Sequence, residues 1–433
     1  MFKAVAGYYK DNERLRLLVK IIAVWLISRA VMLLMVQVMN LIADEPHQWL
    51  YYMNPWDAEW YKGIVENGYQ PPKSSGMASW AFFPLYPLVC MAVRLVTMGS
   101  IDTYAVGMTV SNICIIIAVY YAVKYADIEL DMKKYNKKTV EDIIIFLMLA
   151  GPFAVYYGAM YTEALFILCV ILCFYNSARH NYMEAGIAAA MASATRVVGC
   201  MLVFVLITYM FMEVCAECRA KHNSKVKDNK EAGIIDKYML TDEAGIMLAG
   251  NISLASVIKT FIKNVIKEPK KLVAIMISPL GIFIYMNYLR YLCGDSWAFY
   301  HVQRAWRTQK MFPVIGVLFK SCTGQLTAAS GVKTLNGIIL GWLCVITLML
   351  YAAMIRKKHY ALGIFGIIVL LIPLTSSVMS TLRFIMGSFV IYIGVAEIIA
   401  GCNRYVRYGI IALLSIVEVV VISAWYFWDG LLM

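Results

Sequence analysis

The chain alternates between apolar blocks about 20 residues long and short polar connections over nearly its whole length. An α-helix needs about 20 apolar residues to cross the hydrocarbon of a bilayer, whereas membrane β-strands alternate apolar and polar residues. The pattern therefore predicts an all-α polytopic membrane protein, with residues 1–433 forming a single membrane-embedded domain. The simplest blocks predict spans at residues 17–42, 104–125, 141–158, 162–178, 271–290, 332–355, 361–376, 384–401 and 408–427.

The apolar block at residues 183–214 does not fit one ordinary span. It is about 30 residues long, and a single crossing would place the basic stretch at 219–237 outside the cell. Because basic connections stay in the cytoplasm, we expect two half-length passes that turn near residues 196–199. This gives about eleven passes, provided that the apolar stretch at 81–98 lies along the membrane or dips into it.

Charge adds an orientation to this topology. Lysine and arginine outnumber aspartate and glutamate by 39 to 27, which gives a net charge of +12, and 27 of the 39 lie at the N-terminus or in five other polar stretches. Positive charge concentrated in this way marks the cytoplasmic side. We expect a cytoplasmic N-terminus, an outer C-terminus and no nucleic-acid partner. The five stretches are residues 124–138, 179, 219–271, 356–358 and 404–407.

Two connections are longer than the rest. Residues 43–103 are rich in aromatic residues and proline, and a loop of this length is usually functional, so we expect an extracytoplasmic catalytic loop that carries juxtamembrane helices. Residues 215–270 predict a cytoplasmic loop with an amphipathic helix at 254–267. Its lysines at 259, 263 and 267 share one face, which is typical of a helix that lies on the inner leaflet.

Three acidic residues of the outer side are candidates for chemistry, because ionisable groups near hydrocarbon are costly. Asp57 lies among aromatic residues just beyond the first span, where a low dielectric would raise its basicity enough to take a proton from a sugar hydroxyl. The alternative to a catalytic role for Asp57 is an ion pair with Lys62 at the membrane surface. Glu59 is a weaker candidate, two residues further along. Glu163 starts a span, where it either caps the helix or orients an arginine or a substrate hydroxyl.

Four basic residues lie on the outer side or just inside its boundary. They are level in depth, so they could converge on a phosphate; the alternative is contact with lipid headgroups. We interpret Arg29, in the first span, as structural, and Glu418, in the last span, has no assignment. The four residues are Arg196, His301, Arg304 and Arg383.

Two long motifs resemble those of the PIG-V family, the mannosyltransferases that add the second mannose to glycosylphosphatidylinositol, and their bacterial relatives. They are Trp56-Asp-Ala-Glu-Trp-Tyr-Lys-Gly-Ile-Val-Glu-Asn-Gly-Tyr69 and Ala81-Phe-Phe-Pro-Leu-Tyr-Pro87. Shorter matches follow in family order at residues 161–166, 194–199 and 299–306, and at Arg383. The resemblance covers residues from about 20 to 400.

The resemblance implies a GT-C glycosyltransferase fold and an inverting enzyme. Such an enzyme takes a sugar, here expected to be mannose, from a polyprenyl phosphate on the outer face. Asp57 matches the acidic residue that is the proposed general base, and the four basic residues above match loosely as phosphate ligands. We expect an acceptor other than glycosylphosphatidylinositol: a glycan, a glycolipid or a protein.

We also predict no cofactor and a metal-independent reaction; a divalent metal bridging Asp57 and Glu59 is the less favoured alternative. No Walker motif and no dinucleotide fingerprint occurs in the sequence, so the energy must come with the substrate. The rival hypothesis is a transporter or flippase for a lipid-linked saccharide. Transporters tend to show internal repeats, and no convincing repeat is visible here. A degenerate family member that serves as a scaffold is a third possibility.

Overall fold

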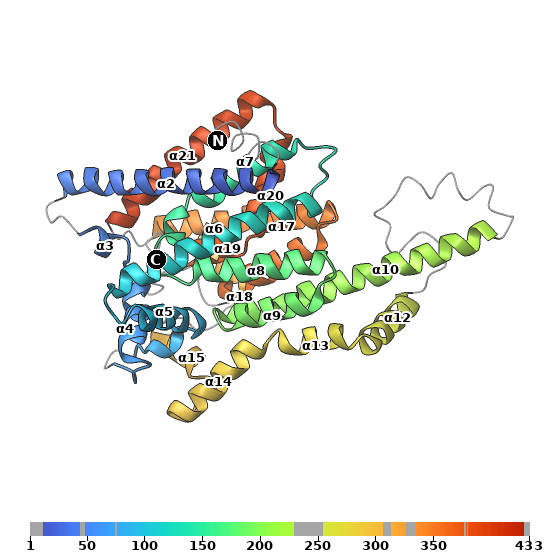
Figure 1. Cartoon of the computed structure of the whole chain (residues 1–433), viewed down its shortest axis with the longest axis horizontal. Helices are drawn as coiled ribbons and strands as arrows, with labels where there is room; N and C mark the ends of the chain where they lie inside the picture. The colour runs from blue at the N-terminus through green and yellow to red at the C-terminus, as the bar shows by residue number, and fades with distance from the viewer. Residues whose placement is uncertain are drawn as a thin grey trace, which may run out of the picture.

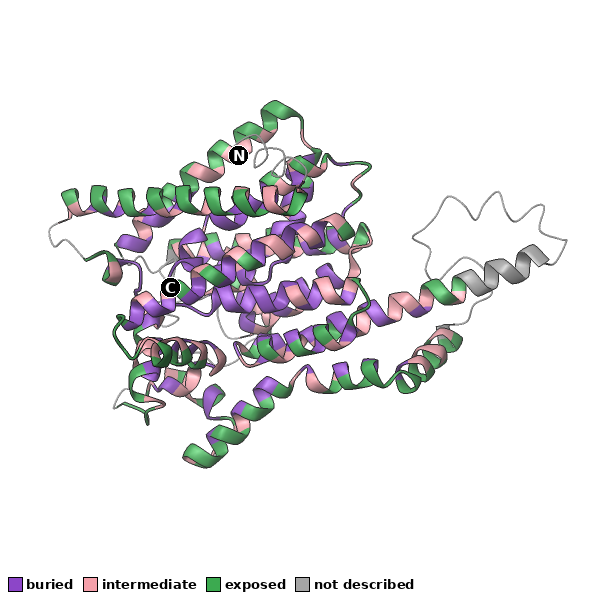
Figure 2. Ribbon diagram, in the orientation of Figure 1, coloured by how far each residue is buried: buried purple, intermediate pink, exposed green. Residues whose placement is uncertain are grey.

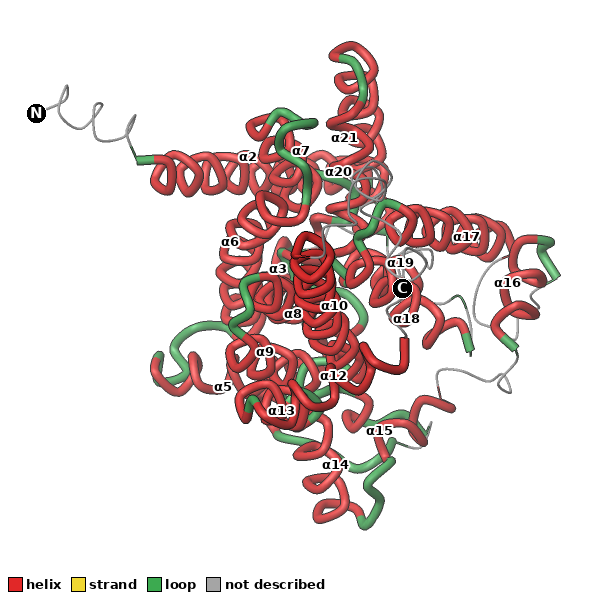
Figure 3. Tube along the Cα trace, turned by 90° about the vertical axis from the view of Figure 1, so that its right-hand side faces the viewer, coloured by secondary structure: helices red, strands yellow, loops and turns green. Residues whose placement is uncertain are grey.

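The structure, a computed structural model, describes residues 12–43, 48–73, 76–228, 254–305, 313–325, 334–375, 378 and 380–427. This part of the chain consists of helices joined by turns and loops and contains no strand (Figure 3). The all-α fold expected from the sequence is confirmed.

The α-helices are α2 (Glu13–Ile42), α3 (Trp49–Tyr52), α4 (Asp57–Asn67), α5 (Leu85–Val96), α6 (Thr103–Glu129), α7 (Lys137–Leu149), α8 (Glu163–Ala178), α9 (Tyr182–Ser193), α10 (Leu202–Asp228), α12 (Leu254–Lys267), α13 (Pro269–Ile277), α14 (Leu280–Cys293), α15 (Ala298–His301), α16 (Val314–Cys322), α17 (Thr334–Arg356), α18 (Tyr360–Leu374), α19 (Thr381–Gly387), α20 (Val390–Gly401) and α21 (Arg404–Tyr426). Four 3-10 helices join them: η1 (Ser79–Ala81), η2 (Ala154–Tyr157), η3 (Val197–Met201) and η4 (Val302–Ala305).

Several of these helices are long and apolar enough to cross a membrane. Among the described residues there are 5 such helices, or up to 7 if each of two bent pairs forms one span. The helices α2 and α6 contain the spans predicted at 17–42 and 104–125. The helices α17 and α21 cover residues 334–355 and 408–426 of the spans predicted at 332–355 and 408–427, and residues 332–333 lie outside the described part of the chain. The pairs α13–α14 and α19–α20 bend by 42° and 70° within the spans predicted at 271–290 and 384–401. The multi-pass character is thus supported, but the expected eleven passes are not confirmed.

The span predicted at 141–158 is not one continuous helix. Helix α7 ends at Leu149, and Gly151 and Pro152 follow before the short turn η2. Helix α8 begins only at Glu163, so residues 150–162 connect two helices of 13 and 16 residues through irregular backbone. Glycine followed by proline stops a helix, which the hydropathy of the block conceals.

The chain reverses direction where the block at 183–214 was predicted to turn. Helix α9 ends at Ser193, and η3 packs back against its last turn. A Cβ atom added to Gly199 would lie 2.3 Å from the backbone of Ala192, so this close approach requires glycine. The second arm is longer than expected, since Val197–Arg219 by itself is long enough to span a membrane. The prediction of two half-length passes was therefore wrong for α10.

The described helices of the two long loops lie at opposite ends of the bundle, as the predicted topology requires. Figure 1 places α3, α4, α5 and α15 at one end, and α12 with the end of α10 at the other. Buried residues concentrate in the central helices α6 and α8, whereas α2, α14 and α21 expose apolar side chains outward (Figure 2). Helix α5 has only 12 residues, too few to cross the bilayer, which agrees with a segment that dips into or lies along it. Which end faces the cytoplasm stays a prediction.

The amphipathic segment is helical, as predicted. Along α12, the side chains of Ile258, Ile262 and Ile266 form an exposed apolar stripe. Each is followed by one of the lysines at 259, 263 and 267, so basic groups flank the stripe. The contact of this helix with the inner leaflet stays a prediction.

Histidine 359 links three helices through two carboxylates. Its Nδ1 lies 2.8 Å from Glu129 Oε1 of α6 and its Nε2 lies 3.9 Å from Glu397 Oε2 of α20. Burial alone would lower the pKa of His359, but its hydrogen bonds to the two glutamates outweigh burial and raise this pKa from 6.5 to about 9. Protonation of His359 therefore stabilises the folded state by on the order of 3 kcal/mol.

We therefore expect the thermal unfolding midpoint in detergent to fall as the pH rises from 6.5 through 9, because the folded state loses the bound proton. The change His359→Gln should flatten this pH dependence. As a matched control, His180→Gln should keep the wild-type slope, because the His180 side chain is 58% exposed and its ring lies 3.5 Å from its only ion-pair partner among the described residues, Glu213. Equal slopes for wild type and His359→Gln would contradict the assignment.

Candidate functional site

Four charged side chains from distant parts of the chain form one continuous cluster. Arg383 Nη1 of α19 donates to Asp57 Oδ2 at the start of α4, at 2.5 Å. The same guanidinium donates through Nε to Glu163 Oε1 at the start of α8, at 2.6 Å. Arg196, just before η3, donates through Nη1 to that same Glu163 oxygen at 2.9 Å. Two carboxylates thus neutralise two guanidinium groups.

The four side chains differ in their access to solvent, and this difference gives the cluster a direction. The exposed fraction of the side chain is 2% for Glu163, 10% for Arg383 and 14% for Arg196, but 27% for Asp57. Among the described residues, Glu163 Oε2 is buried without a hydrogen-bond partner. Glu163 is therefore the buried anchor of the cluster, and Asp57 is its accessible end.

Aromatic side chains hold both guanidinium groups in place. Arg383 lies 4.9 Å from the ring centre of Tyr161, and Arg196 lies 5.2 Å from the ring centre of Phe384. Such cation–π contacts add to the ion pairs where water is excluded. Tyr161 also donates through its hydroxyl to Pro55 O at 2.7 Å, which ties the wall of the cluster to the turn before Asp57.

Unusual backbone turns precede two residues of the cluster, Asp57 and Arg383. Trp56, directly before Asp57, has a φ of +49°, and its ring packs edge-on against Trp425 of α21 at 5.3 Å. Ser380, which begins the α19 turn that carries Arg383, has a φ of +61°. Non-glycine residues rarely adopt positive φ values and often do so where function constrains the backbone.

The irregular segment at 150–162 is largely buried and leads directly into Glu163 at the start of α8. Nonhelical backbone at membrane depth must have its polar groups satisfied by the protein, and side chains from other helices supply them. The N–H group of Phe153 donates to Glu418 Oε2 at 3.0 Å. The N–H group of Met160 donates to Asn54 Oδ1 at 2.7 Å. The carbonyl oxygen of Ala154 accepts a hydrogen bond from Arg29 at 3.4 Å. The carbonyl oxygen of Gly158 accepts one from Asn112 at 3.5 Å, and that of Tyr161 accepts one from Ser111 at 3.3 Å.

These contacts give a role to the two charges that the sequence left unexplained. Arg29 packs against backbone oxygen, as the structural interpretation expected. Its guanidinium also lies so close to Gly158 that a Cβ atom there would be 3.1 Å from Nη1. Glu418 supports the same segment from the last helix. No feature of the sequence near Glu418 indicates this, because its partner lies 265 residues away.

Three of the predicted site residues do not contact the cluster in the described part of the chain. Glu59 accepts a hydrogen bond from the hydroxyl of Tyr104. His301 Nδ1 lies 2.6 Å from Asp295 Oδ2, and this hydrogen bond lowers the pKa of the Asp295 carboxyl. Arg304 is exposed on η4. Asp57, Glu163, Arg196 and Arg383 are thus brought together, whereas roles for Glu59, His301 and Arg304 stay predictions.

In the same described ranges, no three side chains of histidine, cysteine, aspartate or glutamate are grouped so that they could hold a metal ion. The cluster itself offers two carboxylates that are already bound by arginine. Metal independence of the reaction stays a prediction.

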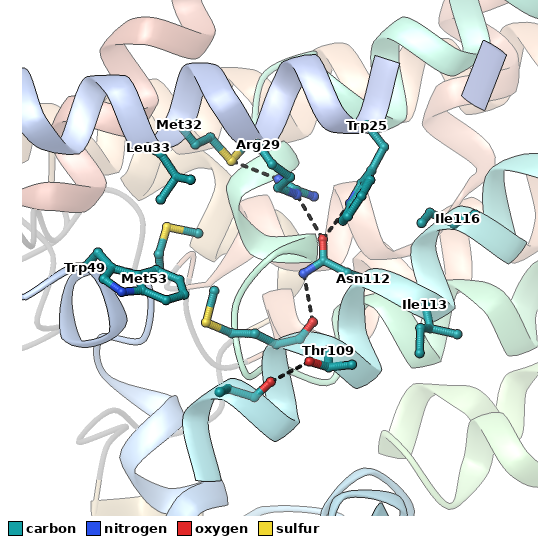
Figure 4. A pocket seen from close by; sticks show the side chains of 12 residues that line it. Trp25, Arg29, Met32, Leu33, Trp49, Met53, Thr109, Asn112, Ile113 and Ile116 are labelled. Atoms are coloured by element: carbon teal, nitrogen blue, oxygen red, sulfur yellow. Dashed lines mark hydrogen bonds between the residues drawn. The ribbon is translucent and has the colours of Figure 1, made fainter. Parts of the chain in front are cut away.

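A cavity of about 370 Å³ lies apart from the charged cluster, between α2, α3 and α6 (Figure 4). Apolar side chains line most of it, and none of the four clustered residues is among them. Its polar centre is Asn112, whose Oδ1 accepts from Trp25 Nε1 at 2.7 Å and from Arg29 Nε at 2.9 Å. This asparagine also contacts the irregular segment at 150–162, so the polar wall of the cavity supports the backbone that leads into Glu163.

The chain was compared with curated protein sequences, with solved structures and with protein-family models. No curated protein sequence matches the chain. Solved structures of the oligosaccharyltransferase of Archaeoglobus fulgidus are similar in overall shape. One, tethered to an acceptor peptide, has a TM-score of 0.46 and 13% identity and covers 97% of this chain. Another, AglB with an inhibitory peptide and a dolichol-phosphate, has a TM-score of 0.44 and 12% identity and covers 98%. This chain spans 56% of the length of either.

A family model provides the stronger comparison. The model for mannosyltransferase (PIG-V) matches residues 15–231, which include Asp57, Glu163 and Arg196 of the cluster. Since this match spans half of the 433 residues, the chain belongs to the mannosyltransferase (PIG-V) family of membrane glycosyltransferases.

Proposed function

We propose that the protein is an inverting glycosyltransferase that moves a sugar, with mannose as the first candidate, from a polyprenyl phosphate to an acceptor hydroxyl. The acceptor would be a glycan, a glycolipid or a protein on the extracytoplasmic face, and the fold would be of the GT-C class. One observation carries the proposal beyond the family: a partly exposed carboxylate, Asp57, lies in one cluster with two guanidinium groups. This arrangement supports a proposal in which the base and the phosphate site are adjacent.

The cluster supplies what a single displacement requires. Asp57 takes the proton of the acceptor hydroxyl as its oxygen forms a bond to the anomeric carbon. The bond from that carbon to the phosphate oxygen breaks on the opposite side, and the electron pair leaves with the phosphate, so the configuration inverts. Arg383 and Arg196 stabilise the charge on the departing phosphate. No proton donor for the leaving group is needed.

Glu163 acts in this proposal as a positioning residue. Its Oε1 binds both guanidinium groups, which fixes their separation before substrate arrives. Preorganised charges of this kind need no rearrangement when charge develops in the transition state. Because Glu163 is buried, it contacts the arginines and not the substrate.

The test is sugar transfer by the purified protein. Polyprenyl-phosphate-mannose and polyprenyl-phosphate-glucose, each with a radiolabelled sugar, would be supplied with native membranes as the source of acceptors. We expect labelled acceptor from the mannose donor, with no loss of transfer after treatment with a chelator. If folded protein transfers neither sugar, the proposal fails; movement of intact donor between leaflets without transfer would favour a flippase.

A further inference from the structure

Arg383 divides its hydrogen bonds between two carboxylates with different surroundings. Its Nε edge faces Glu163, whose side chain is 2% exposed, whereas its Nη1 faces Asp57, whose side chain is 27% exposed. Glu163 is also held by Arg196 on the same oxygen. An incoming polar ligand can therefore reach the contact with Asp57 but not the contact with Glu163.

The contact with Asp57 conflicts with the use of Asp57 as a base. A carboxylate oxygen that already accepts a hydrogen bond from a guanidinium is not free to accept one from a substrate hydroxyl. In the arrangement observed, the Asp57 oxygen that binds Arg383 is occupied at 2.5 Å. The base is thus masked by the same arginine that would bind the donor.

We propose, building on the function proposed above, that the phosphate of the lipid donor displaces Asp57 from Arg383 Nη1. Glu163 keeps the Nε edge of Arg383 fixed while the Nη1 edge exchanges the carboxylate for the phosphate. The freed Asp57 then accepts the proton of the acceptor hydroxyl. The donor binds before the acceptor is activated, and the base stays inactive until a sugar is in place.

This exchange makes Asp57 a competitor of the donor phosphate, which predicts an unusual binding result. The change Asp57→Asn removes the competing charge, so the variant should bind farnesyl phosphate more tightly than wild type, by about tenfold, a common effect for one charged hydrogen bond. Isothermal titration of each purified protein in detergent measures this affinity without any turnover. An aspartate that served only as a base or as packing would give no such gain.

Glu59→Gln is the matched control. It removes one carboxylate charge two residues from Asp57, but the structure places Glu59 against Tyr104 rather than Arg383. If general electrostatics governed binding, both variants would bind more tightly; the exchange predicts a gain for Asp57→Asn alone. Arg383→Gln should lose the preference for farnesyl phosphate over farnesol. Unfolding curves of all three variants exclude misfolding as the cause of a weaker affinity.

The outcomes separate this inference from the function on which it rests. Equal or weaker binding by folded Asp57→Asn would overturn the exchange, even if wild type transfers sugar. Equal gains for Asp57→Asn and Glu59→Gln would also overturn it. If wild type binds farnesyl phosphate no better than farnesol, the proposed phosphate donor itself fails.

Discussion

Replacing Asp57 by asparagine is expected to lower the rate of sugar transfer by about 10²- to 10⁴-fold, the usual loss when a general base is removed. Asparagine has nearly the same shape and can still accept a hydrogen bond from Arg383, so the cluster stays packed, but it cannot take up the acceptor proton. The measurement is the initial rate of labelled sugar transfer at saturating donor, so that a change in donor affinity does not enter.

The matched control is again Glu59→Gln, which lies on the same short helix. Its carboxylate contacts Tyr104 in the structure, and the amide of glutamine can accept the same hydrogen bond. We expect this variant to lose less than about tenfold in rate. Similar losses for both variants would mean that the charge of the loop, and not the position of Asp57, is what the reaction needs.

Much of the cluster could be predicted from the sequence because its members stand out chemically. Asp57, Glu163, Arg196 and Arg383 are charged residues at the predicted outer ends of apolar blocks, where charge is costly. Their pairing could not be predicted, because the Arg383–Asp57 contact joins residues 326 positions apart. Hydropathy gives depth in the membrane but not rotation about a helix axis, so Glu59 could be ranked below Asp57 only by its position two residues further along.

For the fold as well, the sequence predicts where the chain turns but not the local geometry of the backbone. The turn within the block at 183–214 followed from length and charge, because the block is too long for one ordinary span and a reversal keeps the basic stretch after it on the expected cytoplasmic side. The break after Leu149 was missed, although Gly151 and Pro152 signal it. The break lies within an apolar block, and hydropathy does not distinguish a helix from irregular backbone that is buried in protein.

The supports of the irregular segment explain why Arg29 and Glu418 lie in the membrane at all. Arg29 of α2 and Glu418 of α21 both satisfy backbone groups at residues 153–154. The first and last long helices of the described chain therefore hold the irregular segment that positions Glu163 against the arginines. The geometry of the charged cluster thus depends on packing of the whole bundle rather than on the loop at 43–103 alone.

Removing the buried anchor should have the largest effect on stability. The change Glu163→Ala leaves the guanidinium groups of Arg196 and Arg383 close together, with Asp57 as the remaining carboxylate of the cluster. Breaking a buried ion pair by removing one partner costs about 3–5 kcal/mol, because an uncompensated charge remains. We expect a clear fall in the thermal unfolding midpoint in detergent at a fixed heating rate, and a smaller fall for Glu163→Gln, whose amide oxygen can still accept a hydrogen bond.

Farnesyl phosphate distinguishes this explanation from a simple packing defect. In Glu163→Ala the truncated side chain leaves a space beside the two arginines that is closed in wild type. The anionic phosphate can replace part of the missing charge there, so it should raise the unfolding midpoint of Glu163→Ala more than that of wild type. Glu184→Ala is the control, since Glu184 of α9 is exposed and its removal should change stability by less than about 0.5 kcal/mol. A cavity alone would lower the midpoint without this selective rescue, and the role of Glu163 as the anchor of two guanidinium groups would then be wrong.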